Sequence, residues 1–121
     1  MENERLNMTF EYERSTIRIC PRAIELLKNP DHIQLRIHND KLLVLVNPCR
    51  KEDYNAFRVP DTIDPKSGMR VYSAYFATLL WNAMKWDVEK TYIIYGLYNK
   101  KENVCVFDLK SFEQITERGL L

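Results

Sequence analysis

The sequence predicts an α+β domain in which two copies of one small unit form a single β-barrel-like core. The predicted order of strand, strand, short helix, strand and strand in residues 6–48 recurs in residues 56–110. Arg18 in Ile17-Arg18-Ile19 and Arg70 in Met69-Arg70-Val71 open the same run of elements. A unit of about 45 residues buries too little apolar surface to fold alone. The two copies are therefore expected to share one core about a pseudo-two-fold axis, either interleaved or packed side by side.

The first copy begins with two short strands and a helix. Residues 6–13 alternate apolar and polar side chains, which is typical of a half-buried strand, and residues 16–20 form a second short strand. Pro21 then stands in the first turn of a short apolar helix, where proline is tolerated. The Asn-Pro-Asp run at residues 29–31 ends that helix.

Each copy closes with a predicted β-hairpin. Residues 32–38 alternate strictly, Asn39-Asp40 supplies turn chemistry, and residues 41–46 return as a strongly apolar strand. Residues 91–98 and 103–109 repeat this pattern in the second copy.

The second copy opens with a short strand at residues 56–59 and a loop rich in proline and aspartate. Residues 69–72 form its second strand, and Ser73 is a plausible cap for a helix over residues 74–86, whose apolar side chains recur every three or four residues. This predicted helix is longer than its counterpart in the first copy.

The remaining segments connect or follow the two copies within one domain, residues 1–121. Residues 49–55 contain a charge cluster and have linker character, and residues 111–121 are expected to form a C-terminal helix or tail. Most of the second copy's aromatic side chains are expected in the core, although the strand over residues 91–98 is expected to expose a tyrosine on at least one face. The aromatic residues concerned are Tyr72, Tyr75, Phe76, Trp81, Trp86, Tyr92, Tyr95 and Tyr98.

Composition excludes several classes of function. Hydrophobic residues make up 45% of the 121 residues and charged residues 29%, as in globular proteins. Eighteen Lys and Arg against seventeen Asp and Glu give a net charge of +1, so any nucleic-acid binding must come from a local patch. No apolar run approaches the roughly 18 residues needed to span a bilayer, and the first residues are polar. We expect a cytoplasmic protein with no membrane partner.

The sequence carries no strong signal for catalysis, metal or cofactor. Cys20, Cys49 and Cys105 are an odd number without paired spacing, and we expect reduced thiols in or beside apolar strands. A zinc site would have to combine Cys20 and Cys49 with His32 and His38, yet no two of these form a local ligand pair. No glycine-rich phosphate loop or nucleophile elbow is present. We therefore expect no cofactor, no metal and no enzyme.

The order of elements, the Ile17-Arg18-Ile19-Cys20-Pro21 strand and the closing hairpin together resemble the AbrB-like swapped-hairpin DNA-binding domains. Two copies on one chain are similar to the arrangement of the MraZ regulators. The resemblance covers nearly all of residues 6–109 and is closer in residues 16–46. It implies an interleaved barrel that binds duplex DNA.

Two departures from that pattern bear on function. Family members carry a Gly-Arg pair at the turn into the second strand and a Leu-Arg pair in the helix. The aligned positions here lack those arginines and read Thr16-Ile17, Ile24-Glu25, Gly68-Met69 and Phe76-Ala77. The basic residues that remain near these loops are the candidate DNA contacts, namely Arg14, Arg18, Arg22, Lys66 and Arg70. The alternative is that Arg18 and Arg70 are simply the outward residues of alternating strands.

Three functions remain open. The first is a DNA-binding transcriptional regulator that contacts duplex DNA through these basic loops. The second is a protein-interaction module of the same fold without DNA binding, which dimerises or binds a partner through exposed hairpin edges. The third is a small ligand-binding protein or enzyme. The missing arginine pairs and the low net charge count against the first and favour the second.

Overall fold

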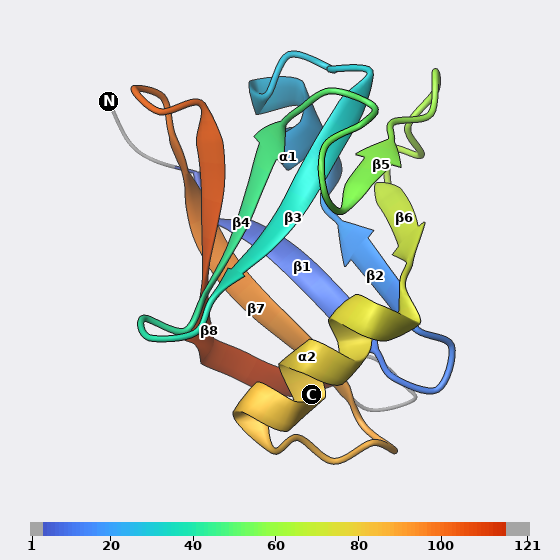
Figure 1. Cartoon of the computed structure of the whole chain (residues 1–121), viewed down its shortest axis with the longest axis vertical. Helices are drawn as coiled ribbons and strands as arrows, with labels where there is room; N and C mark the ends of the chain where they lie inside the picture. The colour runs from blue at the N-terminus through green and yellow to red at the C-terminus, as the bar shows by residue number, and fades with distance from the viewer. Residues whose placement is uncertain (1–3, 116–121) are drawn as a thin grey trace.

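The computed structural model describes residues 4–115, which form one eight-stranded antiparallel sheet curved into a nearly closed barrel (Figure 1). The strand order is β5-β3-β4-β8-β7-β1-β2-β6. The strands are β1 (Leu6–Glu11), β2 (Thr16–Ile19), β3 (His32–His38), β4 (Leu43–Pro48), β5 (Ala56–Arg58), β6 (Met69–Tyr72), β7 (Thr91–Asn99) and β8 (Val104–Ile115).

Two helices accompany the sheet, α1 (Pro21–Leu26) of 6 residues and α2 (Ala74–Met84) of 11. The barrel-like sheet and the two helices were predicted, but the proportion of strand to helix was not. The fold is mostly β rather than α+β, because both helices are short and β8 alone contains 12 residues. Within the described residues, no helix is long and apolar enough to cross a membrane.

Strands from the two halves of the sequence are mixed within the sheet, so that each half contributes neighbours to the other. β1 pairs with β7 and β5 pairs with β3, whereas β2 pairs with β6. The hairpins β3–β4 and β7–β8 lie side by side through the pairing of β4 with β8. All of these strand pairs are antiparallel, and the curved sheet encloses the side chains of its inner face.

The core lies inside the barrel and beneath the helices. Phe10 of β1 and Phe107 of β8 are fully buried, and α2 directs Phe76 and Leu80 into the same cluster. Ser73 begins α2 because its hydroxyl oxygen accepts the Phe76 N–H at 3.1 Å, as its sequence position predicted.

Both predicted C-terminal limits in the second half need correction. α2 ends at Met84 rather than residue 86, because Lys85 adopts a left-handed conformation with a φ of 57° and its N–H bonds the Trp81 carbonyl. A helix is wrong for residues 111–115, which continue β8 because Glu113 and Ile115 pair with β7. The rest of the predicted tail, residues 116–121, lies outside the described residues.

Gly96 of β7 lies close against the backbone of β8. An added Cβ atom there would lie 2.1 Å from the Val106 carbonyl oxygen, a contact that no side chain can make. Gly96 also pairs with Leu6 of β1 on its other side, so the strand cannot move away freely. The register of β7 shifts just before this point, between Ile93 and Tyr95.

We predict that Gly96→Ala destabilises the protein by about 1–3 kcal/mol, because the added methyl group overpacks a site bounded by backbone. Urea unfolding followed by circular dichroism measures the change. Val88→Ala is the control, because Val88 is 48% exposed and its truncation should change the free energy of unfolding by less than about 0.5 kcal/mol. Equal stability of the two variants would contradict the close approach.

Candidate nucleic-acid interface

Strands β2 and β6 form a two-stranded ribbon that carries one arginine from each half of the sequence. Arg18 lies directly opposite Arg70 in this antiparallel pair. Their strand neighbours on both sides are buried, namely Ile17, Ile19, Met69 and Val71. Since successive side chains of a strand point to opposite faces, both arginines project from the outer face of the barrel. This β2–β6 ribbon is the candidate site.

A tight turn brings β6 alongside the end of β2. Gly68 has a φ of +72°, and an added Cβ atom would lie 2.0 Å from the Ile19 carbonyl oxygen. The Asp64 carboxylate accepts the backbone N–H groups of Lys66 at 2.7 Å and Ser67 at 2.9 Å. These hydrogen bonds, the one from Ser67 first, hold the pKa of Asp64 below its ordinary value, and the charge of Arg70 adds to the effect.

The electrostatics of the pair are unfavourable in the free protein. Directly opposed residues of an antiparallel pair have Cβ atoms about 4.5–5.5 Å apart, and like charges there destabilise the sheet. Neither Arg18 nor Arg70 forms an ion pair with a carboxylate of residues 4–115. An anion placed between the two guanidinium groups would relieve this repulsion.

Two other predicted residues flank the ribbon at its opposite ends. Arg14 lies in the turn before β2, and Lys66 lies in the turn before β6; both are exposed. Arg14 is 3.7 Å from the Glu11 carboxylate, but the Arg14 side chain is 76% exposed, so that ion pair holds it weakly. The ribbon thus has basic residues at its centre and at both ends, with Glu11 near Arg14 and Asp64 near Lys66.

Arg22 does not join this group. Its guanidinium donates to Glu4 at 2.7 Å and to Glu25 at 3.0 Å. These hydrogen bonds, the one to Glu4 first, raise the pKa of Arg22. Two carboxylates already neutralise the arginine, so the prediction that Arg22 contributes to a basic surface finds no support in its contacts.

Three exposed tyrosines lie near the ribbon and were missed as surface residues. Tyr72 is 64% exposed and pairs with Thr16 on the outer face. Tyr75 is 55% exposed, and its ring makes an edge contact with that of Tyr54 at 6.4 Å between centroids. Tyr72 and Tyr75 are therefore exceptions to the expectation that most aromatic side chains of the second copy lie in the core. Strand alternation gives Tyr72 the same outward direction as Arg70, which was the available signal.

The cysteines do not form a reactive or metal-binding centre in the part of the chain that the structure describes. No cluster of three or more His, Cys, Asp or Glu side chains is close enough to hold a metal ion within residues 4–115. Cys105 is fully buried in the barrel, whereas Cys20 and Cys49 are half-buried. Burial raises the pKa of the Cys105 thiol to about 12, because a thiolate loses its hydration there.

No family model matches the chain, and neither a curated protein nor a solved structure matches it. The resemblance to AbrB-like domains therefore stays a prediction, and the functional argument depends on the residues themselves.

We predict that Cys105 resists alkylation in the native protein. At a pH of about 8.5 its raised pKa keeps it as the unreactive thiol, and its burial excludes the reagent. Iodoacetamide labelling followed by mass spectrometry should modify Cys105 only after unfolding, with the half-buried Cys49 as the internal comparison. Native labelling of Cys105 as fast as that of Cys49 would show that the barrel opens readily at β8.

Proposed function

We propose that this protein binds duplex DNA through the β2–β6 ribbon and acts as a transcriptional regulator. The observation that carries the proposal is the direct opposition of Arg18 and Arg70 on the outer face, where neither forms an ion pair with a carboxylate of residues 4–115. Two opposed arginines repel each other in the free protein, whereas a phosphate group bound between them would be attracted to both.

We further propose that the two halves of the chain are interleaved repeats related by a pseudo-two-fold axis. The elements β1, β2, α1, β3 and β4 of the first half correspond in order to β5, β6, α2, β7 and β8 of the second. Replacing each strand by its counterpart turns the six-strand order β5-β3-β4-β8-β7-β1 into its own reverse. The same exchange maps β2 onto β6 and Arg18 onto Arg70. The axis would therefore pass through the centre of the ribbon, between the two arginines.

This arrangement suits double-stranded DNA for a geometric reason. Paired β-strands are among the elements that read DNA grooves, and a two-fold protein matches the local two-fold symmetry of the duplex. Arg14 and Lys66, at opposite ends of the ribbon, then extend toward phosphates on either side of the groove. Arginine at the centre is also the residue type that most often reads guanine edges.

A second candidate function is capture of a protein partner by the same surface. The exposed Tyr54, Tyr72 and Tyr75 favour it, because tyrosine and arginine are enriched at protein interfaces. The nearby Glu11, Glu13 and Asp64 reduce the positive field of the ribbon, which also weakens long-range attraction to DNA.

We predict that the protein binds a random duplex-DNA pool with micromolar or tighter affinity and that Arg18→Ala with Arg70→Ala weakens it. Loss of two phosphate contacts should lower the slope of log K against log salt concentration by about 2. Fluorescence anisotropy between about 50 and 200 mM salt measures both quantities.

The matched control is Lys100→Ala with Lys101→Ala, which removes the same charge from the exposed β7–β8 turn. It should leave affinity and slope nearly unchanged. Absence of DNA binding at the lowest salt concentration would refute the regulator proposal and leave partner capture. Equal losses in both double variants would mean that net charge, rather than the ribbon, attracts DNA.

A further inference from the structure

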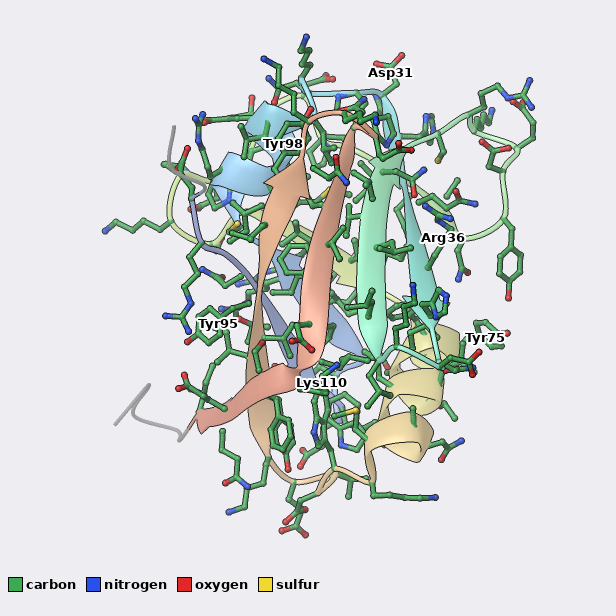
Figure 2. The ribbon with its side chains drawn as sticks, turned by 90° about the vertical axis from the view of Figure 1, so that its left-hand side faces the viewer. Asp31, Arg36, Tyr75, Tyr95, Tyr98 and Lys110 are labelled. Carbon is green, nitrogen blue, oxygen red and sulfur yellow. The ribbon has the colours of Figure 1, made fainter. Side chains whose placement is uncertain are left out.

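The outer face of the four central strands, away from the β2–β6 ribbon in the strand order, carries apolar side chains where a solvated face would be polar. Arg36 of β3 pairs with Leu45 of β4, which pairs with Val106 of β8, which in turn pairs with Leu97 of β7. One row across this face therefore contains three apolar residues and ends at an arginine. Figure 2 views the molecule from the side of these strands.

Residues 43–46 of β4 are apolar on both faces of the strand, and the polar Asn47 follows them. Val44 and Val46 point into the core and are fully buried, while Leu43 and Leu45 point outward and are only partly covered. Antiparallel strands with one solvated face normally alternate apolar and polar residues, and continuous apolar runs are typical of strands that are covered on both faces. The outer face of β4 thus has the composition of a covered surface.

We define the outer stripe as Leu43, Leu45, Leu97 and Val106. Its most exposed member, Leu97, is 45% exposed. The stripe crosses three adjacent strands, β4, β8 and β7, in which Leu45, Val106 and Leu97 are cross-strand neighbours and Leu43 lies opposite Asp108.

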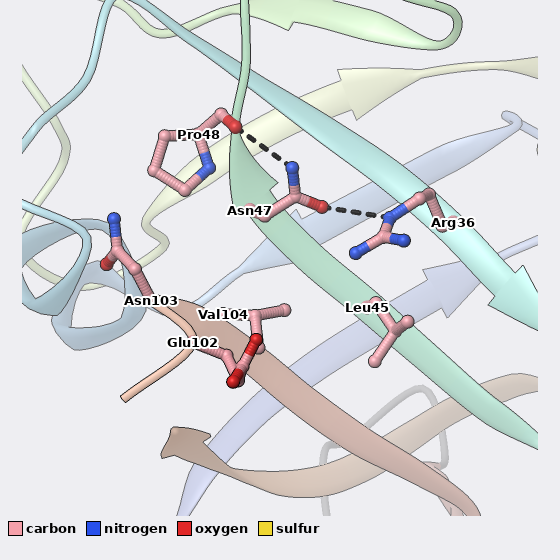
Figure 3. A pocket seen from close by; sticks show the side chains of 7 residues that line it. All are labelled: Arg36, Leu45, Asn47, Pro48, Glu102, Asn103 and Val104. Atoms are coloured by element: carbon pink, nitrogen blue, oxygen red, sulfur yellow. Dashed lines mark hydrogen bonds between the residues drawn. The ribbon is translucent and has the colours of Figure 1, made fainter. Parts of the chain in front are cut away.

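A groove of about 340 Å³ hollows the same face beside the stripe (Figure 3). Leu45, Pro48 and Val104 supply its apolar lining, and Arg36 and Glu102 stand on opposite sides of β4 in this view. The Arg36 Nε donates to the Asn47 side-chain oxygen at 3.0 Å, which holds the guanidinium over the face.

The two borders of this surface carry opposite charges that are not used within one chain. Neither Arg36 nor Glu102 forms an ion pair with another residue of the described range 4–115. A second copy that packs on this face about a two-fold axis can offer its Glu102 to Arg36 and receive the reciprocal pair. Such reciprocal pairs between Arg36 and Glu102, which both line the groove, would make this part of the face complementary to itself in charge.

We propose that a second copy of this chain packs on the outer stripe and forms a symmetric homodimer. The proposal does not depend on DNA binding, because the β2–β6 ribbon lies on other strands and stays free in such a dimer.

Sedimentation velocity over a range of protein concentrations tests the proposal. The natural sequence should sediment with twice the monomer mass, and Leu97→Glu should raise the dissociation constant at least about tenfold, because a charge would be buried among leucines. Val88→Glu is the matched control, since Val88 is 48% exposed but lies outside the stripe, and it should leave the dimer intact.

Charge exchange tests the orientation of the copies. Arg36→Glu and Glu102→Arg should each weaken the dimer several-fold, and the double variant should restore it, because the reciprocal pairs re-form with reversed sign. Far-ultraviolet circular dichroism verifies that each variant is folded. A monomer at every concentration overturns the proposal, and so does a dimer that Leu97→Glu leaves unchanged.

Discussion

Antiparallel pairing between strands that are distant in sequence is the constraint on which this molecule depends. β1 finds its second partner in β7, and β5 finds its partner in β3, so neither half of the chain completes its sheet without the other. The same pairing closes the barrel around Phe10 and Phe107, which are buried only because strands from both halves surround them. The position of the arginines is a further result, because β2 meets β6 only within the assembled sheet.

The β2–β6 ribbon combines features that oppose stability with features that favour binding. Two like charges face each other across the ribbon, and both arginine side chains are partly or largely exposed to solvent. The buried inner face, with Ile17, Ile19 and Val71, holds the strands together despite this repulsion. An anion bound between the two arginines would relieve this repulsion and so raise the free energy of unfolding.

Local patterns predicted the local structure well. Alternation located the strands, Asn39-Asp40 and the apolar run after it identified a hairpin, and Ser73 marked the start of α2. Boundaries failed where tertiary pairing decided them: residues 111–115 continue β8 because Thr91 to Ile93 lie opposite them, which no local signal records. The helical content was overestimated, because α2 ends at Met84 and residues 111–115 belong to β8; the fold is mostly β.

The site was predicted in part. Arg18 and Arg70 were recognised as outward residues of equivalent strands, but their mutual pairing depends on strand order, which the sequence does not encode locally. Of the two carboxylates that Arg22 contacts, Glu25 is 3 residues away and offered a local signal, whereas Glu4 is 18 residues away in sequence. Tyr75 is exposed because it lies off the helix stripe that contains Phe76 and Leu80, a position that aromatic content alone does not reveal.

The pairing of β1 with β7 also has a consequence for synthesis of the chain. The β1–β2 hairpin emerges from the ribosome early, yet the other edge of β1 waits for a strand near the end of the sequence. Contacts of such long sequence separation form slowly, and an open strand edge invites pairing with neighbouring chains. During synthesis the second edge of β1 therefore has no permanent partner until β7 has been made.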